Sequence, residues 1–370
     1  MKRNLVALAV AGAFLAPAAA MADGSGIVLT GVIHGDIGFG EEKRSDGSKE
    51  YKRQANIGTF ATRWEIDGTE DLGWSQVIFG LAMDQQFAGK GTGGGITRNN
   101  NNIDQSSVAN RNSYLGLTGG WGTLKVGQNE HRYEIQQILQ DPDPASESQY
   151  GTLSLMTGYG IGGLPGFTRR DPQSVWYTSP DFGGVTVDLA YITPAGRKND
   201  TVSPDGVQVA VQWKSAFGLS VYGSFAQYND ELGSDNKNQA GRLGVGYGTE
   251  LFQIDVAAEQ LKFKDNDGGV LGTSGDEMKR TNFMVSGALN FGQHHIRAAF
   301  NNAQKAKFNG STVNDSAARL YYLGYGYTLS KRTELQVIYG KVDNKDNACF
   351  AVVSCGNDSE RFGVGIRHTF

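Results

Sequence analysis

Apolar and polar residues alternate with a period of two in one segment after another along this chain. The segments 184–191 ("GVTVDLAY") and 206–214 ("GVQVAVQWK") each carry an apolar residue at every second position. A period of two places one set of side chains on each face of a β-strand. Because such segments run for about ten residues with no convincing helical stretch between them, the pattern predicts an all-β, antiparallel architecture.

The connections between these segments come in two lengths that alternate along the chain. Short ones such as 119–122 ("GGWG") and 215–218 ("SAFG") are followed by long polar ones. Sixteen candidate strands begin near residues 26, 55, 74, 111, 122, 173, 184, 206, 218, 239, 251, 280, 293, 317, 332 and 360. They leave seven short turns and eight long loops. An even strand number with short turns at one end and long loops at the other is typical of a transmembrane β-barrel.

The chain ends in the segment 361–370 ("RFGVGIRHTF"), which places Phe362, Val364, Ile366, His368 and Phe370 on one side of a strand. In a wide barrel the apolar face meets lipid and the polar face lines water, so we expect these residues to face lipid. Aromatic residues near strand ends fit two interfacial girdles: Trp64, Trp74, Trp121, Trp176, Tyr191, Trp213, Tyr327 and Phe370. The alternative is a large soluble β protein, since aromatic residues are also common in ordinary strands.

The N-terminal segment has the features of a secretory signal peptide. Residues 1–22 combine a basic start, an apolar run and a small-residue site, which predicts cleavage after Ala22 and a barrel domain over 23–370. Without Lys2 and Arg3 the chain has 32 basic against 38 acidic residues, a net charge of −6, which argues against nucleic acid as a partner. In an oxidising compartment the neighbouring Cys349 and Cys355 are expected to form one loop disulfide.

Several segments resemble a known family. They are 68–73 ("GTEDLG"), 110–128 ("NRNSYLGLTGGWGTLKVGQ"), 174–184 ("SVWYTSPDFGG"), 323–340 ("LGYGYTLSKRTELQVIYG") and 363–370 ("GVGIRHTF"). Together they look like the general porins of Gram-negative outer membranes, in particular the neisserial-type branch, over the whole mature chain.

The resemblance implies a homotrimer of sixteen-stranded transmembrane β-barrels in the cell outer membrane, exported through a signal peptide. Its third external loop would be 129–171, folded inward to narrow a pore for passive diffusion of small hydrophilic solutes and ions. Membrane lipid, lipopolysaccharide and the outer-membrane barrel assembly machinery are the implied partners, with Phe370 as the assembly signal. No cofactor and no metal are expected.

Charged side chains on lumen-facing positions carry the chemistry of a pore. In 59–67 ("TFATRWEID") the apolar positions set the lipid face, which turns Arg63, Glu65 and Asp67 inward. By the resemblance Arg63 stands at a constriction position, Arg111 at a second, and Arg170 at a third, with Arg169 as a competing assignment. Arg111 is opposite in phase to Tyr114 but shares the phase of Leu115, which leaves its direction open. Further lumen-facing candidates are His34, Asp36, Asp84 and Asp188.

The inward loop supplies the acids Glu134, Asp141, Asp143 and Glu147. Carboxylates that face arginines across a narrow water channel set up a transverse field, which orients dipolar solutes and slows apolar ones. Because acids outnumber bases overall, we expect a weakly cation-selective, non-specific pore. A solute-specific channel is the closest alternative. An outer-membrane barrel enzyme would need a histidine in a catalytic arrangement, and none of the five histidines lies in a recognisable nucleophile motif, so no enzymatic activity is expected.

Overall fold

The computed structural model describes residues 26–44, 48–59, 62–84, 111–130, 132–135, 141–142, 151–161, 164–194, 204–232, 235–351 and 354–370. The predicted signal peptide and its cleavage site after Ala22 lie outside the described residues, and so do Asp143 and Glu147. Among the described residues, no helix is long and apolar enough to cross a membrane.

The described strands join into one antiparallel sheet. Their bounds are β1 Gly26–Lys43, β2 Lys49–Gly58, β3 Arg63–Asp71, β4 Gln76–Asp84, β5 Ser113–Gly119, β6 Gly122–Glu130, β7 Arg170–Thr178, β8 Val185–Ile192, β9 Asp205–Lys214, β10 Leu219–Asn229, β11 Asn236–Gly248, β12 Phe252–Asp265, β13 Asp276–Phe291, β14 His294–Ala303, β15 Lys307–Phe308, β16 Ser311–Thr312, β17 Ala318–Ser330, β18 Thr333–Asn344 and β19 Asp358–Thr369. A short 3₁₀ turn, η2 (Thr152–Ser154), lies between β6 and β7.

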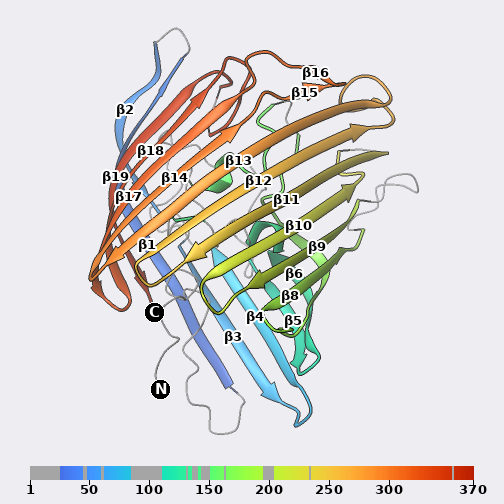
Figure 1. The fold of residues 1–370 in the computed structure, drawn as a ribbon, viewed down its shortest axis with the longest axis vertical. Coiled ribbons are helices and arrows are strands. Elements are labelled where there is room, and N and C mark those ends of the chain that lie inside the picture. The colour runs from blue at the N-terminus through green and yellow to red at the C-terminus, as the bar shows by residue number, and fades with distance from the viewer. Residues whose placement is uncertain are drawn as a thin grey trace.

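The sheet closes on itself because its first and last strands pair. On one side β1 pairs with β19, and on its other side it pairs with β2 and then β3. The sheet has nineteen strands, of which β2 and β3 together form a single wall strand. The short strands β15 and β16, of two residues each, pair with each other at the rim, where β15 also pairs with β13. The wall of the described chain thus has sixteen strands, which confirms the predicted antiparallel barrel (Figure 1).

The second wall strand differs from its prediction. It was expected to begin near residue 55, but β2 begins at Lys49, and the strand is interrupted between Gly58 and Arg63. At the break the Thr62 side chain replaces the backbone hydrogen bonds of a regular strand pair. The His34 N–H donates to Thr62 Oγ1 at 3.0 Å, and that hydroxyl donates to the His34 carbonyl at 3.0 Å. The two buried polar groups of the His34 backbone are therefore satisfied without a regular partner strand.

The faces of the wall are inverted relative to a soluble protein. Large apolar side chains point outward, as in β9, where Val209 is 41% exposed, while charged and polar side chains on the opposite phase are buried. Such a pattern fits an outer surface solvated by lipid. Trp176 is a correction to the predicted girdle: it is only 8% exposed and faces inward near Lys125, because Val175 takes the outward phase of β7.

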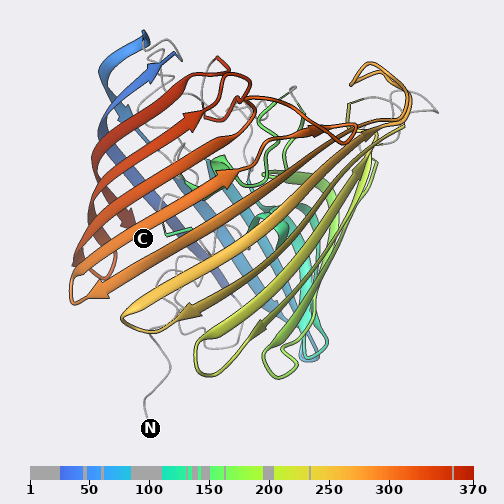
Figure 2. The same ribbon diagram turned by 45° about the horizontal axis from the view of Figure 1, so that its top comes forward.

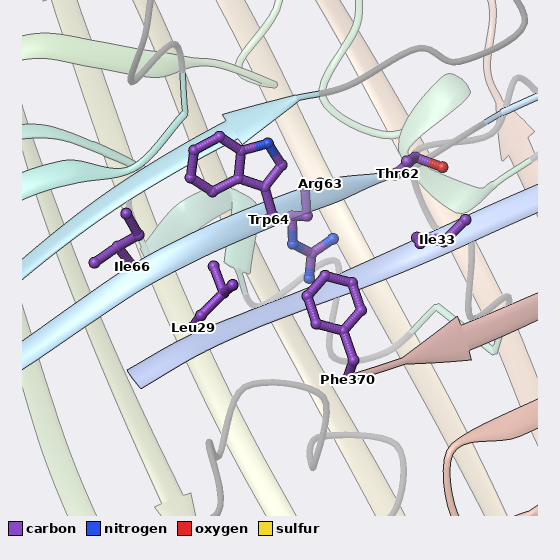
Figure 3. Close-up of a pocket in the computed structure, with 7 residues that line it drawn as sticks. All are labelled: Leu29, Ile33, Thr62, Arg63, Trp64, Ile66 and Phe370. Atoms are coloured by element: carbon purple, nitrogen blue, oxygen red, sulfur yellow. The ribbon is translucent and has the colours of Figure 1, made fainter. Parts of the chain in front are cut away.

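The C-terminal residue closes the seam between the two ends of the chain. The Phe370 N–H donates to the Gly31 carbonyl and the Gly31 N–H to the Phe370 carbonyl, each at 3.1 Å. A Cβ at Gly31 would lie 2.4 Å from the Phe370 ring, so only glycine leaves room for it. Figure 3 shows Phe370 beside Leu29 and Trp64 in an apolar groove of about 590 Å³ on the outer wall.

The two rims carry different connections. Adjacent strands are joined by short turns at one rim, for example the two residues between Gly119 and Gly122, where Gly122 has φ +113°. Longer segments join them at the other rim, including 131–169 between β6 and β7 and 345–357 between β18 and β19. Figure 2 shows the tilted strands, with the segment around η2 inside the ring that they form.

Candidate functional site: the charged lumen

The described parts of the segment 129–171, here called the inward loop, contact the inward face of the wall at widely separated strands. The Arg132 Nε donates to Asp188 of β8 at 2.8 Å, and the Tyr133 hydroxyl donates to Glu259 of β12 at 2.6 Å. The Asn301 side chain of β14 donates to the Thr152 carbonyl at 2.8 Å. These described parts therefore lie on the lumen side of the wall.

Glu259 is the main attachment of the inward loop. Besides the Tyr133 hydroxyl, it accepts hydrogen bonds from the Thr157 N–H at 2.7 Å and from Asn282 Nδ2 at 3.0 Å. Arg242 pairs with Glu259 and donates to the Tyr133 carbonyl at 2.8 Å; both charged side chains are fully buried. Burial raises the pKa of Tyr133 well above its usual value, so the phenol stays protonated and donates. Because every partner supplies a donor, the buried carboxylate is compensated.

A cluster of opposite charges gathers where β4, β5, β6 and β7 meet the inward loop. Arg111 contacts Asp84 with one terminal nitrogen and lies 3.2 Å from Glu130 with the other, and Arg170 contacts the same Glu130 oxygen. Arg111 precedes β5, which begins at Ser113, so the alternation of that strand does not set its direction. Glu130 was not predicted as a site residue, although it joins the two arginines.

Arg169 belongs to a different cluster from Arg170. Its Nε lies 2.5 Å from Asp171, its Nη1 contacts Glu231, and its guanidinium stacks over the Tyr228 ring with 4.1 Å to the centroid. Burial raises the pKa of Glu231, and the charge of Arg169 offsets part of that rise. The two adjacent arginines thus point to different groups of acids.

Further predicted lumen residues also form ion pairs at hydrogen-bond distance. The Arg63 Nε donates to Glu65 at 2.9 Å, and Arg361 of β19 donates to Asp36 of β1 at 3.0 Å. Asp67 is half-buried on the same inward phase of β3. Arg361 was not among the predicted site residues.

Two loop acids and one wall histidine are buried. Asp141 is 2% exposed, and its Oδ2 accepts hydrogen bonds from the Thr152 N–H at 2.5 Å and the Thr152 hydroxyl at 2.7 Å. Glu134 is buried and accepts a bond from the Arg169 N–H at 2.8 Å. His34 is buried in β1 at the strand break. In this arrangement the carboxylates of Asp141 and Glu134 fasten the inward loop to itself.

The disulfide loop 345–357 packs against the inward loop. Cys349 and Cys355 form a disulfide, and the Cys349 N–H donates to the Gly160 carbonyl at 2.7 Å. Phe350 is buried, and a Cβ at Gly160 would lie 2.1 Å from its ring. Gly160, with φ +61°, therefore permits both the loop conformation and the close contact.

The chemistry of these clusters is electrostatic. Three described histidines near the short-turn rim bond hydroxyl or amide groups: His294 bonds the Tyr325 hydroxyl, His295 bonds Asn290 and Thr328, and His368 bonds Thr333. His295 also lies 3.9 Å from the Glu334 carboxylate. Among the described residues, no group of three or more His, Cys, Asp or Glu side chains is arranged to hold a metal ion. The paired charges create local fields along the lumen.

Comparison with known proteins gives one consistent result. A family model described as Gram-negative porin matches residues 6–347. The major outer membrane protein P.IB of Neisseria meningitidis serogroup B is 25% identical over 386 residues, covering 100% of both chains. The outer membrane porin protein 32 of Delftia acidovorans is 25% identical over 394 residues with the same coverage. The solved anion-selective porin from Comamonas acidovorans is 21% identical, covers 94% of this chain and 100% of its own, and has a TM-score of 0.73.

Proposed function

Because the chain belongs to the Gram-negative porin family, we propose that it forms a water-filled channel for passive diffusion of small hydrophilic solutes and ions across the outer membrane. It is an outer-membrane β-barrel, and the observation that carries the proposal is its inverted wall. Apolar side chains cover the outside of sixteen closed strands, and paired charges line the inside. A soluble barrel would show the opposite arrangement, with polar side chains on the outside and apolar side chains on the inside.

The inward loop sets the size of the passage. Its attachments to Glu259, Asp188 and Asn301 hold it across the interior, so that it narrows the water path between the wall clusters. Solutes that exchange part of their hydration shell for charged side chains pass, and apolar solutes are retarded. Transport involves no chemical step, and the protein acts as a channel rather than an enzyme.

A weak preference for cations is the proposed selectivity. In the cluster around Arg111 the two cations, Arg111 and Arg170, are matched by Asp84 and Glu130, so it adds little net positive charge. Asp67 forms no ion pair with a described residue, and the Glu65 side chain is 27% exposed. Carboxylates beside the water path raise the local concentration of cations.

The proposed assembly is a homotrimer in contact with membrane lipid and lipopolysaccharide. OmpT of Vibrio cholerae has a similar fold and is 15% identical to this chain, and its solved structure is described as a trimer form. Phe370 is proposed as the signal read by the barrel assembly machinery, supported by its exposed ring at the seam of the wall.

Planar-bilayer recording of the refolded protein in a salt gradient tests the function. Stepwise insertions in groups of three conductance levels, with a reversal potential on the cation side, are expected. A protein that folds in detergent and inserts into the bilayer but carries no current would refute the channel.

A further inference from the structure

Arg280 is the exception among the buried arginines of the lumen. It lies on β13 and is 1% exposed, and none of its three side-chain nitrogens has a hydrogen-bond partner in the described chain. Its guanidinium faces the ring of Phe350 with 5.0 Å to the centroid. Arg242 is equally buried but has Glu259 as its counter-charge. No acid among the described residues forms an ion pair with Arg280.

The surroundings of Arg280 are mostly apolar. Its partner across the β12–β13 ladder is Leu261, and Met278 precedes it on the same face; both are buried. A guanidinium keeps its proton in proteins, so it cannot escape burial by becoming neutral. An unpaired buried charge is strongly destabilising, whereas a paired one is tolerated. The position therefore calls for a negative charge that the described part of the chain does not supply.

The side-chain amides of two asparagines on β13 and β14 have a hydrogen-bond partner for the nitrogen but none for the oxygen in the described chain. The Nδ2 atoms of Asn282 and Asn301 donate to Glu259 at 3.0 Å and to the Thr152 carbonyl at 2.8 Å, which fixes the orientation of both amides. Their Oδ1 atoms are buried without a hydrogen-bond partner in the described chain. Asn282 follows Arg280 on the inward face of β13, and Asn301 lies on β14, so unpaired donors and acceptors share this part of the wall.

We propose that Arg280 is the centre of a binding site for a small inorganic anion, enclosed by Phe350 of the disulfide loop. The anion supplies the missing counter-charge, and its ordered water molecules donate to the amide oxygens of Asn282 and Asn301. Those two amides also hold Glu259 and Thr152, so an occupied site stabilises the attachment of the inward loop. The inference does not depend on conduction, because the site lies in the wall whether or not the pore is open.

Crystallography with bromide is the direct test. In crystals of the refolded wild-type protein grown in bromide, we expect an anomalous peak within contact distance of the Arg280 guanidinium. A peak-free guanidinium surrounded by water alone, or one that pairs with a carboxylate of the chain, would overturn the proposal.

Thermal unfolding of the detergent-solubilised protein is the second test, with chloride or phosphate replacing gluconate at constant ionic strength. For the wild type, the midpoint temperature should rise with one of the small anions and then saturate. Arg280→Gln should lose the whole rise, whereas Arg319→Gln, which removes the same charge from an exposed position on β17, should keep it. An identical rise in Arg280→Gln, or none in the wild type, would contradict the site. If Arg280→Gln does not fold, the wild-type titration and the bromide peak decide.

Discussion

Glu259 shows how a single residue links the wall to the inward loop. Three donors and Arg242 meet at its carboxylate, and two of the donors, Tyr133 and Thr157, come from the loop. The alternation of β12 places Glu259 on the inward face, but its contact with Tyr133 spans 126 residues. Local periodicity predicts the direction of such a side chain and carries no information about a partner so distant in sequence.

Tyr133→Phe should destabilise the protein by about 1.5 to 3 kcal/mol, because a hydrogen bond to a buried carboxylate is lost while the ring remains. Urea unfolding in detergent measures the change, and open-channel noise should increase as the loop loosens. The control is Tyr191→Phe, whose hydroxyl lies on an exposed side chain of β8 and should cost little. Equal losses in the two variants would mean that the Glu259 attachment is not important.

Glu130 illustrates the limit of phase arguments at single residues. Counting by twos from Lys125, which faces inward near Tyr114, would point Glu130 outward. The β6–β7 pairing shifts register between Gly127 and Asn129, however, and this irregularity turns Glu130 to the lumen, where it meets Arg111. A bulge of this kind leaves no clear mark in the sequence. The alternation of β3, which has no shift in its pairing with β4, was predictable.

The strand is the scale at which the sequence was most informative. Fifteen of the sixteen predicted strand starts lie within four residues of the observed ones, because turn residues and the period of two mark both ends of a strand. The exception is the strand broken between β2 and β3, where Thr62 substitutes for a regular ladder. A side chain that replaces backbone pairing has no periodic signature.

The two faces of β9 should respond differently to charge. Val209→Arg, which places a cation against lipid, should destabilise the barrel by about 2 to 4 kcal/mol if the residue lies near the bilayer midplane. Gln212→Arg, on the inward phase of the same strand, should leave stability nearly unchanged and shift ion selectivity toward anions. Refolding into lipid vesicles at a series of urea concentrations gives both free energies. Similar values for the two variants would disprove the assignment of faces.

The disulfide loop should stabilise the inward loop mainly through Phe350. Its ring is buried against Gly160, so Phe350→Ala should cost about 3 to 5 kcal/mol. The Cys349→Ser, Cys355→Ser double variant opens only a small ring and should cost at most about 2 to 3 kcal/mol. Unfolding of both variants without reductant measures the difference. A larger loss from the cysteines than from Phe350 would reverse this order of importance.

For the whole molecule, closure of the barrel and the polarity of its faces were predictable, whereas the pairing of the charges was not. Asp141 stays a predicted constriction residue, but its hydrogen bonds to Thr152 within the loop were not predicted. Arg169 and Arg170 are adjacent in sequence but join separate clusters, with Glu231 and Glu130. Which acid meets which arginine depends on how distant strands come together around the closed wall.

The ion preference of the channel follows from the balance of these pairs. Replacing Glu65 with Gln and Asp67 with Asn removes two carboxylates from the inward face of β3 and should shift the reversal potential in a salt gradient toward anions. Replacing Arg63 and Arg111 with Gln should shift it toward cations, because this removes two positive charges from beside Glu65, Asp84 and Glu130.

The control removes the same two charges outside the passage. Glu70 and Glu250 are exposed near the short-turn rim, so replacing both with Gln should leave the reversal potential close to that of the wild type. All shifts should shrink at 1 M salt, where the screening length falls to about 3 Å, since the charges act across water. If the Glu65 and Asp67 replacements move the potential no further than this control at low salt, those acids do not border the water path, and the preference must arise at the inward loop instead.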